Sequence, residues 1–99
     1  QKKSKKIEIV GTPKMTVEYT TYLGYSCEIS GTLKNNTSRD YDYVSVEFSV
    51  YDANGNVIGT ALDNINNIGP GESWSFNATL FDFPETKPTS YKLKEITSW

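Results

Sequence analysis

Apolar and polar residues alternate along much of the chain, and this alternation predicts β-strands. A period of two residues places apolar side chains on one face of a strand and polar side chains on the other. The clearest example is residues 44–50, where serine and glutamate alternate with Val44, Val46, Phe48 and Val50. The same period recurs in residues 14–20, 26–34 and 73–80. Together these segments predict antiparallel pairing with one buried face.

Weaker segments add further strands at residues 7–10, 57–62 and 90–97, the first ending at Gly11-Thr12-Pro13. The resulting number, about seven short strands in one chain, predicts an all-β antiparallel sandwich. A small barrel of five or six strands is the alternative fold. The length of 99 residues predicts one domain, residues 7–99, after a short basic linker at residues 1–6.

Local signals predict how some of these strands are connected and paired. Residues 69–72, Gly-Pro-Gly-Glu, fit a type II turn, because proline sets φ at the second position and glycine supplies a positive φ at the third. In the last strand Tyr91 and Leu93 share a face, whereas Ile96 is out of phase. A bulge near Glu95 would restore the phase.

The stretch YDANGN after the strand at 44–50 has two interpretations. Asp52, Asn54 and Asn56 place oxygen atoms on alternate residues, and Asp63 falls at the twelfth place of a calcium loop. The glycine of the stretch is Gly55, at the fourth place of such a loop, where the sixth is required. A hairpin turn, with the carboxylate capping backbone N–H groups and glycine at a positive φ, explains the same residues. The turn is the favoured interpretation.

Charge is distributed unevenly along the chain. The formal net charge is −2, but four of the ten basic residues lie in the first six positions, namely Lys2, Lys3, Lys5 and Lys6. Residues 7–99 therefore carry 6 basic and 12 acidic side chains, a net charge of −6. Such an acidic body disfavours binding to the phosphate backbone of nucleic acids. The basic head is expected to be a solvated linker, with contact to anionic lipid or a cell wall as the alternative.

The single cysteine, Cys27, excludes an intrachain disulfide. Its alternating neighbours predict a buried thiol, and Glu28 beside it has the wrong sign to activate it; a reactive or intermolecular thiol is the alternative. The chain shows no signal peptide, no lipobox cysteine and no apolar run long enough to span a membrane. Its start at Gln1 predicts a mature or trimmed fragment of a longer protein.

Composition also argues against catalysis. The chain contains no histidine, so it cannot form a Ser-His-Asp or Cys-His arrangement or a histidine metal site. The nearest group of carboxylates is Asp40, Asp42 and Glu47, of which two are expected in a loop and one on a solvent-facing strand surface. We therefore predict a protein that is not an enzyme, with no catalytic, cofactor or metal residues and no cofactor.

Tyrosine is the residue type most suggestive of binding. The chain has seven tyrosines, and two groups of them stand out: Tyr19, Tyr22 and Tyr25, and Tyr41 and Tyr43. Exposed aromatic rings bind sugars and peptides, so either group could form a ligand face. Tyrosines are also common in strands for structural reasons alone. The sequence leaves the ligand-binding residues unknown.

The order of features from residue 31 onward resembles the FxLYD domain family. Phe48, Tyr51 and Asp52 match the naming motif, and Val50 replaces its leucine. The likeness covers about residues 29–96, and it includes the segments Gly31-Thr32-Leu33-Lys34-Asn35-Asn36, Asn54-Gly55-Asn56-Val57-Ile58 and Ile68-Gly69-Pro70-Gly71-Glu72. The resemblance implies an immunoglobulin-like sandwich from an extracytoplasmic bacterial protein, often a lipoprotein or membrane-anchored chain.

Composition predicts a non-enzymatic module, and the resemblance implies that it is displayed at the bacterial cell surface or in the cell envelope. It would belong to a lipoprotein or envelope-anchored protein, with any lipid anchor carried by a removed N-terminal segment. The expected role is binding of an unknown protein or cell-envelope ligand. The alternative is a purely structural spacer, and a small carbohydrate-binding or calcium-dependent domain is less favoured. The oligomeric state is not predicted.

Overall fold

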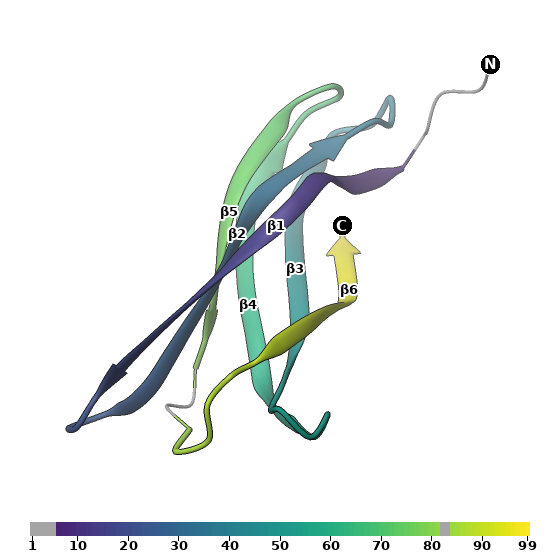
Figure 1. Cartoon of the computed structure of the whole chain (residues 1–99). Helices are drawn as coiled ribbons and strands as arrows, with labels where there is room; N and C mark the ends of the chain where they lie inside the picture. Colours follow the sequence, from purple (N-terminus) through teal and green to yellow (C-terminus); the bar gives the residue numbers. More distant parts are fainter. Residues whose placement is uncertain (1–5, 82–83) are drawn as a thin grey trace.

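The alternating segments form six antiparallel strands in a computed structural model, which describes residues 6–81 and 84–99. The strands are β1 (Ile7–Thr20), β2 (Gly24–Asn35), β3 (Tyr41–Tyr51), β4 (Val57–Ile68), β5 (Ser73–Leu80) and β6 (Ser90–Ser98). They form one sheet in the order β1-β2-β5-β4-β3-β6, which curls into a half-barrel (Figure 1). Within the described residues there is no helix that could cross a membrane.

The predicted number of strands, about seven, is corrected to six. Residues 7–10 and 14–20 belong to one strand, β1, and both parts pair with β2. The register shifts between Val10 and Lys14, where Gly11 adopts a φ of 76°. The Gly11-Thr12-Pro13 segment therefore interrupts the ladder as a bulge but does not end the strand, because both flanking segments keep the same neighbour.

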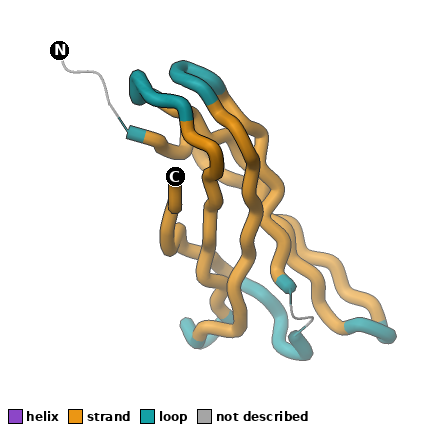
Figure 2. Tube along the Cα trace, turned by 180° about the vertical axis from the view of Figure 1, so that it is seen from behind, coloured by secondary structure: helices purple, strands orange, loops and turns teal. Residues whose placement is uncertain are grey.

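The sheet is nearly divided in its middle. β4 and β5 pair at only two positions, Ala61 with Leu80 and Leu62 with Thr79. Beyond this point the two strands diverge, and the carboxylate of Asp63 accepts the backbone N–H of Asn77 at 2.8 Å. Two three-stranded halves, β1-β2-β5 and β4-β3-β6, thus enclose the core from opposite sides (Figure 2). The two β4–β5 pairs keep these halves joined in one continuous curled sheet.

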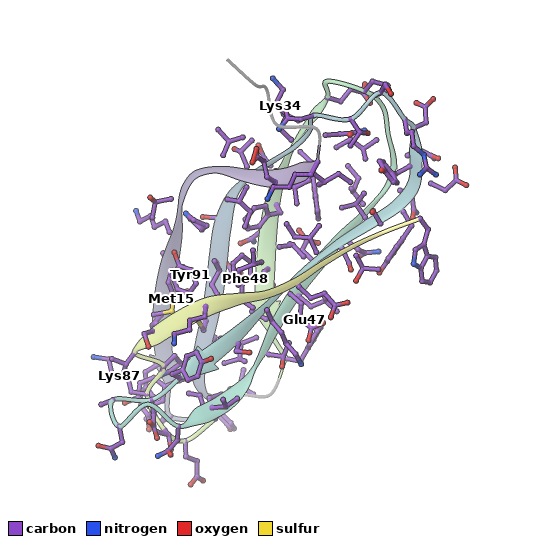
Figure 3. The ribbon with its side chains drawn as sticks, turned by 90° about the vertical axis from the view of Figure 1, so that its right-hand side faces the viewer. Met15, Lys34, Glu47, Phe48, Lys87 and Tyr91 are labelled. Carbon is purple, nitrogen blue, oxygen red and sulfur yellow. The ribbon has the colours of Figure 1, made fainter. Side chains whose placement is uncertain are left out.

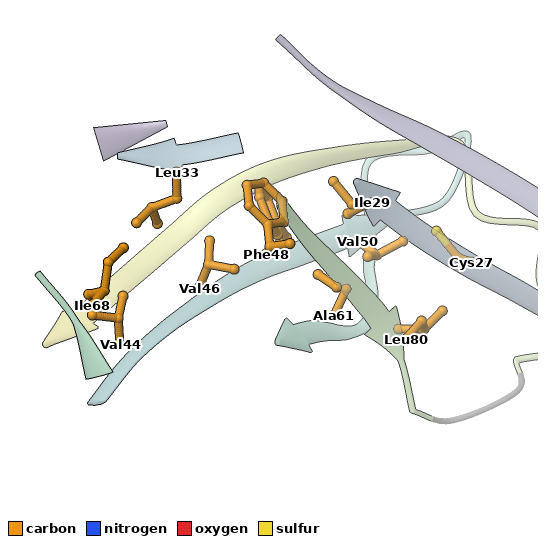
Figure 4. Packing of buried hydrophobic residues seen from close by; sticks show 12 residues of the cluster. Cys27, Ile29, Leu33, Val44, Val46, Phe48, Val50, Ala61, Ile68 and Leu80 are labelled. Atoms are coloured by element: carbon orange, nitrogen blue, oxygen red, sulfur yellow. The ribbon is translucent and has the colours of Figure 1, made fainter. Parts of the chain in front are cut away.

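The core confirms the predicted phase of the central strands. Alternate residues of β2, β3 and β5 point inward from both halves and pack into one cluster (Figure 4). Its buried members are Cys27, Ile29, Leu33, Val44, Val46, Phe48, Val50, Ala61, Ile68, Phe76, Ala78 and Leu80. Burial of this apolar surface is the main source of stability for the fold.

Several strands are longer than the sequence predicted, most of all β3 and β4. β3 begins at Tyr41 and so includes Asp42, which was expected in a loop, and β4 continues to Ile68 rather than ending near residue 62. Tyr41 pairs with Ile68 at the end of this ladder. The extensions are set by pairing between β3 and β4, since residues 63–67 are too polar to identify as a strand by themselves.

The last strand contains the predicted bulge. Glu47 pairs with Glu95 and Phe48 pairs with Leu93, so Lys94 is the additional residue of β6. Tyr91 packs against the core beside Phe48 and donates its hydroxyl to the Pro13 carbonyl at 2.7 Å (Figure 3). This bond joins β6 to β1, the two edge strands, at one point along the open side of the half-barrel.

The type II turn at residues 69–72 is present and is held by a buried asparagine. Gly71 has a φ of 77°, and the Glu72 N–H donates to the Gly69 carbonyl at 3.1 Å. The fully buried Asn35 side chain donates to the carbonyls of Arg39, at 2.8 Å, and Gly69, at 3.0 Å. Asn35 therefore holds the β2–β3 loop against the β4–β5 turn.

Of the predicted basic linker, residues 1–5 lie outside the described residues.

Candidate functional site

The β1–β2 hairpin projects beyond the rest of the sheet. β1 and β2 remain paired as far as Thr20 and Gly24, whereas pairing between β2 and β5 extends only to Glu28 and Thr79. In Figure 1 this end of the hairpin extends to the lower left, away from the other strands. At the turn, Gly24 has a φ of 90° and the Leu23 N–H donates to Thr20 Oγ1 at 3.0 Å.

Residues 19–25, here called the hairpin tip, expose a group of large side chains. Tyr22 is 97% exposed, Tyr19 58% and Leu23 57%. Tyr19 and Tyr25 face each other across the ladder with ring centroids 4.8 Å apart and an interplanar angle of 54°. A shallow pocket of about 310 Å³ is lined by Tyr19, Thr21, Tyr22, Leu23, Gly24 and Glu85. The structure thus gathers all three tyrosines of the first predicted group at the hairpin tip, where Tyr19 and Tyr22 are exposed and Tyr25 is half-buried.

The second tyrosine group lies at the opposite end of the sheet and is engaged within the chain. The Arg39 guanidinium lies over the Tyr41 ring, 5.2 Å from its centroid. Tyr43 packs against Trp99 with ring centroids 5.3 Å apart. A pocket of about 460 Å³ lies beside Tyr41, but most of its lining comes from the polar loop at residues 36–39. These rings are less available to a partner than those of the hairpin tip.

Sequence reasoning found the tyrosines of the hairpin tip but missed Leu23 in the tip and Glu85 in the pocket beside it. Leu23 is adjacent to Tyr22 in the turn, and its exposure could have been suspected because a turn residue has little opportunity for burial. Glu85 lies 60 residues after Tyr25 in the sequence. It reaches the pocket because the neighbouring Pro84 carbonyl accepts the Tyr25 N–H at 3.0 Å. No local pattern would have revealed that contact.

The YDANGN stretch forms the predicted hairpin turn. The Asp52 carboxylate accepts the backbone N–H groups of Asn54 and Asn56 at 2.9 and 2.8 Å, and Gly55 has a φ of 83°. Asp63 lies well inside β4, where its two oxygens accept the N–H groups of Asn64 and Asn77. Among the described residues there is no cluster of acidic or cysteine side chains that could hold a metal ion.

The Asp52 turn gives a prediction for pH dependence. Hydrogen bonds from the turn, the largest from the backbone of Asn56, lower the pKa of Asp52. A carboxylate whose folded pKa is lowered stabilises the fold above its unfolded pKa, and this contribution is lost as the pH falls through the folded pKa. The stability advantage of the wild type over Asp52→Asn should therefore be greatest near neutral pH and shrink below about pH 4. Urea unfolding at a series of pH values measures it; an advantage unchanged down to pH 2 would contradict the assignment.

Cys27 lies on the inner face of β2 and is 1% exposed. Burial, with a smaller contribution from the Glu28 charge, raises the pKa of its thiol, which keeps the sulfur protonated near neutral pH. We expect a thiol reagent to label the folded protein at least about a hundred times more slowly than the urea-unfolded protein, because labelling requires opening of the structure. Similar rates in the two states would contradict burial.

The three carboxylates considered for catalysis do not converge. Asp40 precedes β3 and Asp42 is its second residue, whereas Glu47 lies near the middle of the strand. Five residues of extended strand separate Asp42 from Glu47 by roughly 16 Å. Glu47 instead forms an ion pair with Lys94 at 3.2 Å.

Comparisons of the chain with protein-family models, curated proteins and solved structures found no match.

Proposed function

We propose that this protein is a non-enzymatic binding module that recognises a partner through the hairpin tip. The observation that supports this proposal is the exposure of Tyr22 and its neighbours on a projecting hairpin. Exposing large apolar side chains gains nothing for folding, whereas aromatic anchors contribute strongly to binding. The tip is also held by two strands that remain paired to its end, so little ordering entropy would be lost on binding.

We further propose that the fold is a variant of the immunoglobulin-like sandwich and that the chain is related to the FxLYD domains. Phe48 lies in the core, and Asp52 caps the turn that follows β3, so two motif residues have clear physical roles. The division into β1-β2-β5 and β4-β3-β6 halves is compatible with two facing sheets. On this relationship rests the proposal of an extracytoplasmic bacterial protein, either a lipoprotein or envelope-anchored.

Binding can be tested by co-sedimentation with purified bacterial cell envelopes, which contain both membrane and wall. We expect the wild-type protein to sediment with the envelopes. Tyr22→Ser should weaken binding by about 30-fold, the effect of losing an aromatic anchor worth roughly 2 kcal/mol. Trp99→Ser is the matched control, since Trp99 is also an exposed aromatic residue but lies at the other end of the sheet. Equal losses in both variants would argue against the hairpin tip.

The alternative function is a structural spacer. It is favoured by the elongated shape, with principal dimensions of 46 × 28 × 17 Å, and by the scattered positions of other exposed apolar residues, including Val10, Val57 and Leu93. A spacer would not sediment with envelopes in any variant. That result would overturn the binding proposal while leaving the fold and the FxLYD relationship untouched.

A further inference from the structure

The second half of β1 has an outer edge that is not paired with a described strand. β1 is the first strand in the sheet order, and among the described strands it forms a ladder with β2 alone. Near its middle the edge is occupied, because the Pro13 carbonyl accepts the Tyr91 hydroxyl. From Lys14 onward β1 stays paired with β2 on one side, and no described strand pairs with it on the other side. Such an edge presents backbone N–H and C=O groups to any strand that can approach.

The two edges of the sheet differ in how they are protected. β6 carries a bulge at Lys94 and charged residues along its length, features that discourage pairing with another strand. The first part of β1 has a bulge and Pro13. Residues 14–20 have neither proline nor glycine and remain in unbroken register with β2. This segment is therefore the regular, open part of the edge.

The sequence of this open segment is complementary to itself. If two copies pair antiparallel about Thr16, then Lys14 lies opposite the second copy's Glu18, and Met15 lies opposite the second copy's Val17. Opposite charges, apolar pairs and paired threonines are each favourable when directly across a ladder. In the monomer Lys14 and Glu18 are exposed, and neither forms an ion pair with another described residue. The half-buried Met15 and Val17 would lose exposed surface on the inner face.

We infer that the protein forms a symmetric dimer by antiparallel pairing of residues 14–18 of β1 in two copies. The two copies would be related by a two-fold axis through Thr16, so the Lys14–Glu18 and Met15–Val17 pairs each occur twice and the Thr16 pair occurs once, on the axis. The bulge before Lys14 and the bond at Pro13 limit the ladder at one end, which fixes its register. The dimer would direct its two hairpin tips in opposite directions and does not depend on what the tips bind.

Substitutions that reverse the charge of Lys14 or Glu18 test this inference, with dimerisation measured by sedimentation equilibrium. The wild type should show a concentration-dependent dimer, and Lys14→Glu or Glu18→Lys should raise the dissociation constant at least about tenfold, because two cross-strand pairs become repulsive. The double variant K14E/E18K should restore dimerisation, since opposite charges again face each other. Lys34→Glu is the control for Lys14→Glu, because it makes the same change of charge on β2, away from the open edge. Circular dichroism of each variant verifies folding.

Two results would overturn the inference. A wild-type protein that remains monomeric up to millimolar concentration would show that the edge does not pair with a second copy. A dimer that is insensitive to both single exchanges, or a double variant as weak as the single ones, would place the interface elsewhere. Concentration-dependent protection of β1 amides from hydrogen exchange provides a direct second measurement, because a new ladder protects the edge N–H groups.

Discussion

Phe48→Ala is expected to reduce the free energy of unfolding by about 3–5 kcal/mol. Phe48 is 1% exposed and points from β3 into the core, toward the other half of the sheet. Its ring centroid is 5.7 Å from that of Phe76 on β5 and 5.6 Å from that of Tyr91 on β6. Truncation would remove both aromatic contacts and leave a cavity between elements that are distant in the sequence, so little collapse can compensate.

Urea unfolding measures this loss, and the same substitution at an exposed site provides the control. Phe81→Ala removes an equal number of atoms from a side chain that is 63% exposed, so it should cost less than about 1 kcal/mol. A loss below about 1 kcal/mol at Phe48 would mean that the side chain does not lie in the core. Because small domains are stable by only about 5–15 kcal/mol, the Phe48 variant should be close to unfolding at 37 °C.

Asn35→Ala is expected to cost about 2–4 kcal/mol, although asparagine contributes little apolar burial. The side chain donates two hydrogen bonds to loop carbonyls and accepts two from Thr37, from its backbone N–H at 2.9 Å and its hydroxyl at 2.6 Å. With alanine at this position, the two loop carbonyls and the Thr37 N–H and hydroxyl groups would lose their hydrogen bonds to the Asn35 side chain. It would also release the β2–β3 loop from the turn at Gly69.

Asn36→Ala is the matched control for this prediction. Asn36 is the next residue and the same amino acid, but its side chain makes one hydrogen bond, to Glu8 Oε2 at 3.2 Å, and is only partly buried. We expect a loss below about 1 kcal/mol there. Thermal or urea unfolding of both variants makes the comparison. Equal effects at the two positions would show that the network around Asn35 does not stabilise the fold.

The inner faces of the central strands and two turns could be predicted because each depends on neighbouring residues alone. In β3 a period of two places Val44, Val46, Phe48 and Val50 inward, whatever the strand pairs with. The turn after β3 is specified by Asp52 and Gly55, since a carboxylate cap and a positive φ are properties of the residues themselves.

Other features depend on which strands meet, and local patterns did not reveal them. β1 was divided into two predicted strands because Gly11 and Pro13 resemble a break, whereas pairing with β2 continues on both sides. Leu93 lies across from Phe48 but is 47% exposed, because β6 is at the edge of the described sheet, where β3 is its neighbour. An edge position is a property of the assembled sheet.

The candidate site shows the same distinction. The sequence by itself determined that Tyr19, Tyr22 and Tyr25 lie close together, because they span one short turn of the chain. Only the tertiary structure decided that β5 pairs no further than Glu28, which leaves the hairpin projecting, and that Glu85 joins its pocket. Strand alternation and turn chemistry act over a few residues, whereas strand order, edge exposure and loop contacts require the whole sheet to be in place.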